Sequence, residues 1–259
     1  MSKPNARTDH QRLFVVVPFY NEERGMLATL QALADQLDGD FSLVLVDNCS
    51  TDGSVTLAED FARQHHEMSI QLLHEPTKGT GAASDTGFRF AIAQGAEWIA
   101  RTDADCLPDP DWIQNLKVAL SDDALEFVAG RILPRNDEQS LTAGWRLLIA
   151  MMLWIAENYG KIHRRGPQFR YPYFMAAGNN LAISASLYER SGGFPRSTLE
   201  ELNEDRVLSE TVRTITTRAA RRPDIIVRNS ARRVHAYGVI NTLRWYRNRG
   251  YQPEVVDVR

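Results

Sequence analysis

Short apolar runs at regular intervals in the first half of the chain constrain its fold more than any other feature. The first run, Leu13–Val17 (LFVVV), is continuous and rich in β-branched residues, as expected of a strand buried on both faces. Similar runs follow at 43–46, 70–73 and 98–101, each separated from the last by residues at helical spacing. Alternating strand and helix patterns predict a parallel, doubly wound sheet flanked by helices, an α/β fold.

The segments between these runs predict helices. One apolar face is expected from four residues at helical spacing, Leu27, Leu30, Ala34 and Leu37. Further helices are expected over residues 55–62 and 81–94. After Asp111 the regularity weakens, and we expect a helix over 112–120 and a strand over 127–131. Because no boundary is visible along the 259 residues, we expect a single domain.

Composition restricts the class of protein. Cys49 and Cys106 are the only cysteines and look like thiols of a reducing compartment, so we expect a cytoplasmic location. The most apolar stretch, 141–159, is interrupted by two charged residues, which favours a buried helix over an interfacial one and predicts no membrane span. Residues 206–259 hold twelve arginines and four acids. No nucleic-acid-binding motif accompanies them, so we expect no nucleic-acid partner.

Polar clusters follow three of the predicted strands, at 18–23, 47–54 and 102–106. Parallel sheets bind ligands beyond the carboxyl ends of their strands. Asp103 and Asp105 can converge there on one hard cation, Mg²⁺ or Mn²⁺, that bridges to a diphosphate, although a solvated turn also produces such a triplet. Asp47 is placed to accept hydrogen bonds from a base or ribose, whereas Asp52 is expected to cap the next helix.

Six segments resemble, in their order along the chain, the motifs of family 2 glycosyltransferases of the GT-A fold. They are PFYNEE (18–23), VDNCSTDGS (46–54), KGTGAASDTG (78–87), TDADC (102–106), GNNLA with GGF (178–182, 192–194) and NEDRVLSE (203–210). The resemblance extends from about residue 13 to residue 250. It implies a GT-A-like, Rossmann-type sheet with a nucleotide-binding half at about 10–130 and an acceptor-binding half at about 131–259 that is mainly helical.

The resemblance also implies an activity, the transfer of a sugar from a UDP-, GDP- or dTDP-linked donor to an acceptor hydroxyl, and a role for each matched residue. The donor pocket would be lined by Pro18, Tyr20, Glu22, Asp47, Lys78 and Asp103. The acceptor would be contacted by Asn180 and Trp245. Asp105 would be the direct metal ligand, with Asp103 and His235 as further candidate ligands. Asp205, with Glu204 as second candidate, would deprotonate the acceptor in an inverting single displacement.

Departures from the family pattern bear on the activity. Processive members carry Gln-x-x-Arg-Trp, but Asn241 stands here in place of Gln, which favours a single-addition enzyme. Asp85 stands where the family often has Asn or Arg, so the donor contacts stay open. A retaining glycosyltransferase, a nucleotidyltransferase and a non-catalytic sugar-nucleotide-binding protein are the alternatives. A lipid-linked acceptor, with peripheral contact with the inner face of a membrane, is a hypothesis.

Overall fold

The computed structural model describes residues 12–121, 124–135, 166–196 and 204–230, with six single residues at 144, 147, 151, 154, 161 and 162. The strands are β1 (Leu13–Phe19), β2 (Ser42–Asp47), β3 (Ser69–His74), β4 (Trp98–Arg101), β5 (Cys106–Pro108), β6 (Phe127–Pro134), β7 (Leu181–Ser184) and β8 (Ala219–Asn229). The helices are α1 (Met26–Ala34), α2 (Ser54–Gln64), α3 (Thr80–Ala93), α4 (Trp112–Ser121), α6 (Ala185–Ser191) and α7 (Glu204–Ile215), with a 3₁₀ turn η1 (Gly178–Asn180).

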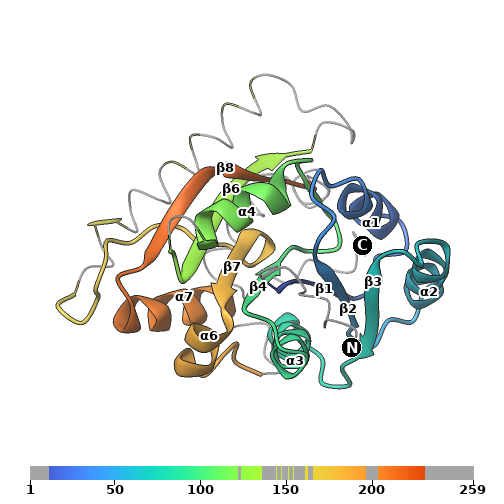
Figure 1. Ribbon diagram of the computed structural model, residues 1–259, viewed down its shortest axis with the longest axis horizontal. Coiled ribbons are helices and arrows are strands. Elements are labelled where there is room, and N and C mark those ends of the chain that lie inside the picture. The colour runs from blue at the N-terminus through green and yellow to red at the C-terminus, as the bar shows by residue number, and fades with distance from the viewer. Residues whose placement is uncertain are drawn as a thin grey trace, which may run out of the picture.

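A single eight-stranded sheet, in the order β3-β2-β1-β4-β7-β6-β8-β5, lies at the centre of these residues (Figure 1). The strands β1 to β4 are mutually parallel, as the apolar runs predict. Side chains of α1, α2 and α4 pack on one face of the sheet, and side chains of α3, α6 and α7 pack on the other. This double cover explains why β1 is buried along its whole length.

The second half of the chain extends the same sheet. β7 pairs antiparallel with both β4 and β6, and β8 pairs in parallel with β6 and antiparallel with β5. The mixed, mostly parallel sheet flanked by helices confirms the predicted fold class. The described part of the second half is richer in strands than expected, since it contributes β7 and β8 besides α6 and α7.

The buried face of α1 differs from the prediction. Its buried residues are Met26, Thr29, Leu30 and Leu33. Leu27 and Leu37 are exposed, and Leu37 lies beyond the end of the helix. The physical reason is a polar contact that an apolar pattern does not reveal. The Thr29 hydroxyl donates a hydrogen bond of 2.7 Å to the carbonyl oxygen of Ala104, in the loop after β4.

The apolar stretch 141–159 is represented by a few described residues. Three of its large side chains, Leu147, Met151 and Trp154, are 73%, 50% and 66% exposed, so at these positions the stretch is not buried as predicted. Their positions share one face of a helix, because they are separated by four and three residues. Within the described part of the chain, every helix is too short or too polar to cross a membrane.

Candidate active site

Asp47 ends β2 and is held by its neighbours at the carboxyl edge of the sheet. Its Oδ1 accepts a hydrogen bond of 2.9 Å from the backbone N–H of Ser50, and its Oδ2 lies 2.8 Å from Nδ1 of His74 at the end of β3. Burial alone would raise the pKa of Asp47, but the hydrogen bonds with Ser50 and His74 outweigh it and lower the pKa. Asp47 is therefore an anionic hydrogen-bond acceptor. Asp52 accepts from the first N–H of α2, at Ser54, although the N-cap position itself is taken by Gly53 and not by the predicted Asp52.

The loops that follow β2 and β3 are tied together by Asn48. Its Nδ2 donates to the carbonyl oxygens of Glu75 and Thr77 at 3.0 and 2.8 Å, and its Oδ1 accepts from Gly79 N–H at 2.8 Å. This arrangement brings two predicted donor-pocket residues together. Lys78 Nζ lies 3.4 Å from the Tyr20 hydroxyl and 5.0 Å from the centre of its ring.

The other two predicted residues of the first loop have different surroundings. Pro18 is buried within β1, where it is paired with Val46 of β2. Glu22 is half-buried, and its backbone N–H donates a hydrogen bond of 2.8 Å to Ser54 Oγ. The first and second loops are therefore held in contact.

Arg101, the last residue of β4, joins the two halves of the site. Its side chain is only 2% exposed. Asp103 Oδ1 lies 3.0 Å from Nη2 and 3.2 Å from Nε of Arg101, and Glu204 Oε1 lies 3.5 Å from both Nη1 and Nη2. The structure thus brings the predicted donor-side carboxylate Asp103 next to the predicted base region. The sequence analysis missed Arg101, although a charged residue ending an apolar run beside Asp-x-Asp is a visible signal.

Glu204 and Asp205 form the first turn of α7, where the helix dipole favours negative charge. Asp205 Oδ2 accepts from Gly178 N–H at 3.1 Å, and its Oδ1 accepts from Arg206 N–H at 2.7 Å. Burial raises the pKa of Glu204, and the positive charge of Arg101 lowers it. The negative charges of Asp205 and Asp103 raise it further, so the pKa of Glu204 lies above its ordinary value. The pair therefore combines an oriented carboxylate with one that holds its proton more tightly.

The chemistry of the donor set is compatible with a magnesium-type ion. Asp103 and Asp105 both follow β4, and Asp105 Oδ1 lies 3.4 Å from the buried Cys106 thiol. Among the described residues, no group of three or more His, Cys, Asp or Glu side chains is arranged to hold a metal. Two carboxylates nevertheless suffice for Mg²⁺, which keeps several waters and takes substrate phosphates as further ligands. His235 lies outside the described residues.

Asn180, the predicted acceptor contact, is engaged within the protein. Its Oδ1 accepts a hydrogen bond of 3.0 Å from the indole N–H of Trp112. Its Nδ2 donates to the carbonyl oxygens of Arg131 and Ile225, each at 3.0 Å. These contacts favour a structural role, and acceptor binding by Asn180 stays a prediction. Trp245, the other predicted acceptor contact, lies outside the described residues.

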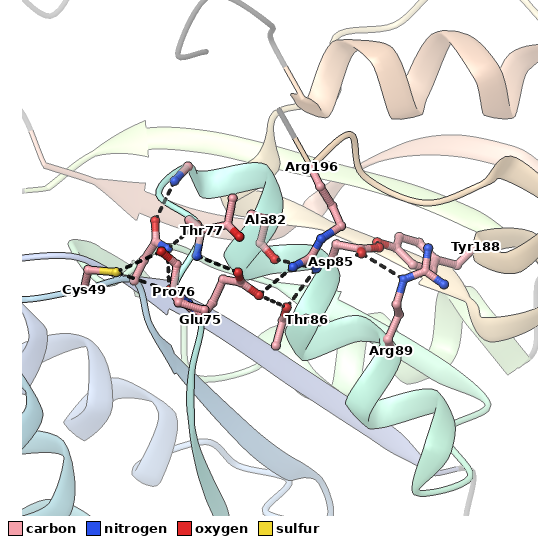
Figure 2. A network of polar contacts seen from close by, with 12 residues as sticks. Cys49, Glu75, Pro76, Thr77, Ala82, Asp85, Thr86, Arg89, Tyr188 and Arg196 are labelled. Carbon is pink, nitrogen blue, oxygen red and sulfur yellow. Dashed lines mark hydrogen bonds and ion pairs between the residues drawn. The ribbon is translucent and has the colours of Figure 1, made fainter. Parts of the chain in front are cut away.

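Asp85, whose donor contact was not predicted from the sequence, lies in a polar network that connects α3 to the loop after α6 (Figure 2). Asp85 accepts hydrogen bonds of 2.8 Å from Tyr188 Oη and Arg89 Nε, and 3.1 Å from Arg196 Nη1. It is completely buried. Asp85 therefore serves the scaffold below the site, and this network was not foreseen from the sequence.

Glu75 shares the same arginine. Its Oε2 lies 2.7 Å from Arg196 Nη2 and accepts from the Thr86 hydroxyl, while its Oε1 accepts from Thr77 N–H at 2.8 Å. Burial alone would raise the pKa of Glu75, but hydrogen bonds from Thr86, Thr77 and Arg196 lower it to about 2. The loop that carries Lys78 is thereby fixed to the loop after α6.

Comparison with known proteins identifies related sequences and structures. The model of glycosyl transferase family 2 matches residues 14–190. An undecaprenyl-phosphate mannosyltransferase of Micrococcus luteus is 28% identical over 152 residues, 58% of this chain and 59% of that protein. An undecaprenyl-phosphate 4-deoxy-4-formamido-L-arabinose transferase of Aeromonas hydrophila is 33% identical over 112 residues, 42% and 33% of the two chains.

Among solved structures, the mannosyltransferase PcManGT from Pyrobaculum calidifontis, in complex with GDP-Man and Mn²⁺, superposes with a TM-score of 0.61 at 26% identity. The match covers 84% of this chain and 56% of that one. The chain thus spans less than two thirds of the length of each of these three proteins.

Proposed function

The chain belongs to glycosyl transferase family 2, and from this premise we propose that it transfers a sugar from a nucleotide-diphosphate sugar to an acceptor hydroxyl. The observation that carries the proposal is the meeting of two groups of carboxylates around buried Arg101. Asp103 comes from the end of β4, and Glu204 comes from the start of α7. Asp103, with Asp105, suits a donor diphosphate with its cation, and Glu204, with Asp205, suits an acceptor that must lose a proton.

On the donor side, Asp47 offers an anionic acceptor to ribose or base, and Tyr20 and Lys78 form an aromatic and cationic wall near the same edge. Asp105 and Asp103 would hold Mg²⁺ or Mn²⁺, which supplies neutralisation of negative charge on the leaving diphosphate when it is bound. The Mn²⁺ and GDP-Man in the Pyrobaculum structure support a nucleotide-sugar donor and a metal for this chain.

On the acceptor side, we assign Asp205 as general base and Glu204 as the second candidate. Asp205 is oriented by the backbone N–H of Gly178, and Glu204 has a raised pKa, which suits a group that takes up a proton. The acceptor oxygen attacks the anomeric carbon while the base takes its proton, and the nucleotide diphosphate leaves from the opposite face. The outcome is inversion in a single displacement.

A second candidate acceptor is a polyprenol phosphate, and two observations favour it. Both relatives named above are undecaprenyl-phosphate transferases. The exposed apolar side chains of Leu147, Met151 and Trp154 would suit the surface of a membrane that contains such a lipid. Because the second pKa of a phosphate monoester is about 6, this acceptor is already ionised at neutral pH and needs no base.

The donor is tested first, by calorimetric titration of UDP-, GDP- and dTDP-sugars with and without Mn²⁺. We expect one donor to bind, and we expect Asp105→Ala or removal of the metal to weaken that binding more than tenfold. Asp35→Ala, an exposed aspartate at the end of α1, is the matched control and should bind as the wild type does. If the wild-type protein bound no donor under any of these conditions, the proposed function would be wrong.

The two acceptors are then separated by Asp205→Asn, assayed with an alkyl glucoside and with undecaprenyl phosphate. With a hydroxyl acceptor, loss of the base lowers kcat by about 10²–10⁴-fold. With the lipid phosphate, kcat changes less than about threefold, because no proton has to be removed. Glu204→Gln is measured beside it, and a larger loss in that variant would transfer the base role to Glu204.

Membrane contact has its own test, the binding of the chain to vesicles that contain anionic phospholipid. Replacing Leu147, Met151 and Trp154 together by glutamine should abolish binding. Replacing Leu27 and Leu37, which are exposed elsewhere, should leave it unchanged. Equal binding by both variants would exclude this surface as the contact.

A further inference from the structure

Arg101 is an arginine buried at the end of a strand whose preceding residues are apolar. Its side chain is 2% exposed, whereas the two carboxylates that it contacts are more accessible, Asp103 at 36% and Glu204 at 18%. The guanidinium therefore lies beneath the carboxylates rather than in the space that a substrate would occupy. Any contribution of Arg101 to the reaction passes through the two acids.

We propose that Arg101 is a positioning residue for sugar transfer, which fixes the donor-side carboxylate of Asp103 relative to the acceptor-side carboxylate of Glu204. The inference rests on the proposed function. The two contacts join segments that are far apart in sequence, since Arg101 and Glu204 are separated by 103 residues. Asp103 lies two residues after the end of β4, and Glu204 begins α7. The single side chain of Arg101 therefore contacts both halves of the site.

The space around the guanidinium has little tolerance for another geometry. A Cβ atom on Gly178 would lie 2.8 Å from Cζ and Nη1 of Arg101. On another side, Cζ lies 5.4 Å from the centre of the Phe194 ring, within the range of a cation–π contact. The planar fork of arginine can reach two carboxylates at once from this position, which the single ammonium of lysine cannot reproduce.

Charge neutralisation alone would not require this arrangement. A single carboxylate would balance one buried guanidinium, yet Arg101 contacts two, and both belong to the groups proposed to act in the reaction. Gly178 also donates its N–H to Asp205, so the residue that encloses Arg101 orients the proposed base as well. Displacement of the guanidinium is thus expected to move Glu204 and Asp205 relative to the donor.

The test compares Arg101→Lys with wild type in donor binding and in turnover, with protein concentration normalised to the number of donor sites. We expect the donor Kd to change less than about threefold. We expect kcat to fall by about 10–100-fold, because a displacement of about 1 Å in reacting groups costs that much. Arg228→Lys is the matched control, because Arg228 contacts a single carboxylate outside the site. Its Nε and Nη2 lie 2.7 and 3.1 Å from the Asp109 oxygens. That variant should retain wild-type kcat.

A double-mutant cycle in kcat shows whether Arg101 acts through Glu204. If it does, the effects of Arg101→Lys and Glu204→Gln do not add. Should Arg101→Lys fail to fold, Phe194→Leu takes its place in the cycle. It removes the ring that lies against the guanidinium without removing a charge.

Three results would separate the explanations. A kcat for Arg101→Lys within twofold of the Arg228→Lys control would overturn the inference. Additive effects in the cycle would also overturn it, since Arg101 would then act independently of Glu204. If the wild type binds no donor sugar, the proposed function fails and this inference fails with it.

Discussion

Asn180→Ala is expected to destabilise the fold rather than to weaken acceptor binding. The Asn180 side chain is 1% exposed, and it makes three hydrogen bonds of 3.0 Å each. Its partners are the indole N–H of Trp112 and the carbonyl oxygens of Arg131 and Ile225. Trp112 is itself completely buried, so alanine leaves its N–H without an acceptor and without access to water.

The magnitude follows from these contacts. Three hydrogen bonds lost at about 1 kcal/mol each, with some added cost for the buried indole N–H, lower the free energy of unfolding by about 3–4 kcal/mol. For a domain of this size, about 2–4 °C per kcal/mol translates this into a fall of about 6–16 °C in Tm. The assay is urea unfolding followed by circular dichroism, in which the midpoint falls and the slope stays constant.

Asn115→Ala provides the matched control. Asn115 lies on α4, is half-buried, and its Nδ2 donates one hydrogen bond of 2.9 Å, to the carbonyl oxygen of Asp224. Its loss should cost about 1 kcal/mol. The reasoning would be refuted if Asn180→Ala unfolded within 1 kcal/mol of wild type while its KM for the acceptor rose. That result would place Asn180 at the acceptor after all.

Two further predictions concern the scaffold. Because the pKa of Glu75 is about 2 in the folded chain and 4.5 ordinarily, its contribution to stability is full above pH 4.5 and is lost as the pH falls toward 2. Glu75→Gln should therefore be less stable than wild type at neutral pH, with a gap that closes on acidification; a constant gap in the unfolding midpoints would contradict this. Gly81→Ala should lower Tm, since its Cβ would overlap the Pro195 carbonyl oxygen, whereas Gly39→Ala, with open space around it, should not.

The parallel half of the sheet was predictable from the sequence because burial on both faces leaves continuous apolar runs. β1 to β4 appear within two residues of their predicted bounds at each end. β8 was not foreseen, since its residues AARRPDIIVRN are polar enough to read as a loop. The face of α1 was misjudged because Thr29 is buried through a hydrogen bond to a distant carbonyl, and only the fold supplies that partner.

Some residues of the candidate site were likewise predictable from the sequence, and others were not. Asp47 and Asp103 were placed at one edge by a general rule, that parallel strands end on the same side. Arg101 and His74 were missed because their roles depend on partners from other strands and helices. The proximity of His74 to Asp47 could nevertheless have been predicted from the strand pairing. Once β2 and β3 are taken as parallel neighbours, the ends of the two strands bring His74 into register with Asp47.

The network around Arg196 limits how this chain can be recombined with its relatives. Asp85 and Glu75 are buried carboxylates, and the arginine that they share lies 111 and 121 residues further along the chain. A donor-loop segment taken from another glycosyltransferase, with Asn or Arg at position 85, would leave Arg196 facing the wrong partner. The buried Tyr188 hydroxyl would also lose the carboxylate to which it donates, and an unsatisfied buried donor destabilises the fold. A chimera designed to change donor preference therefore has to exchange residues 75–86 and 188–196 together.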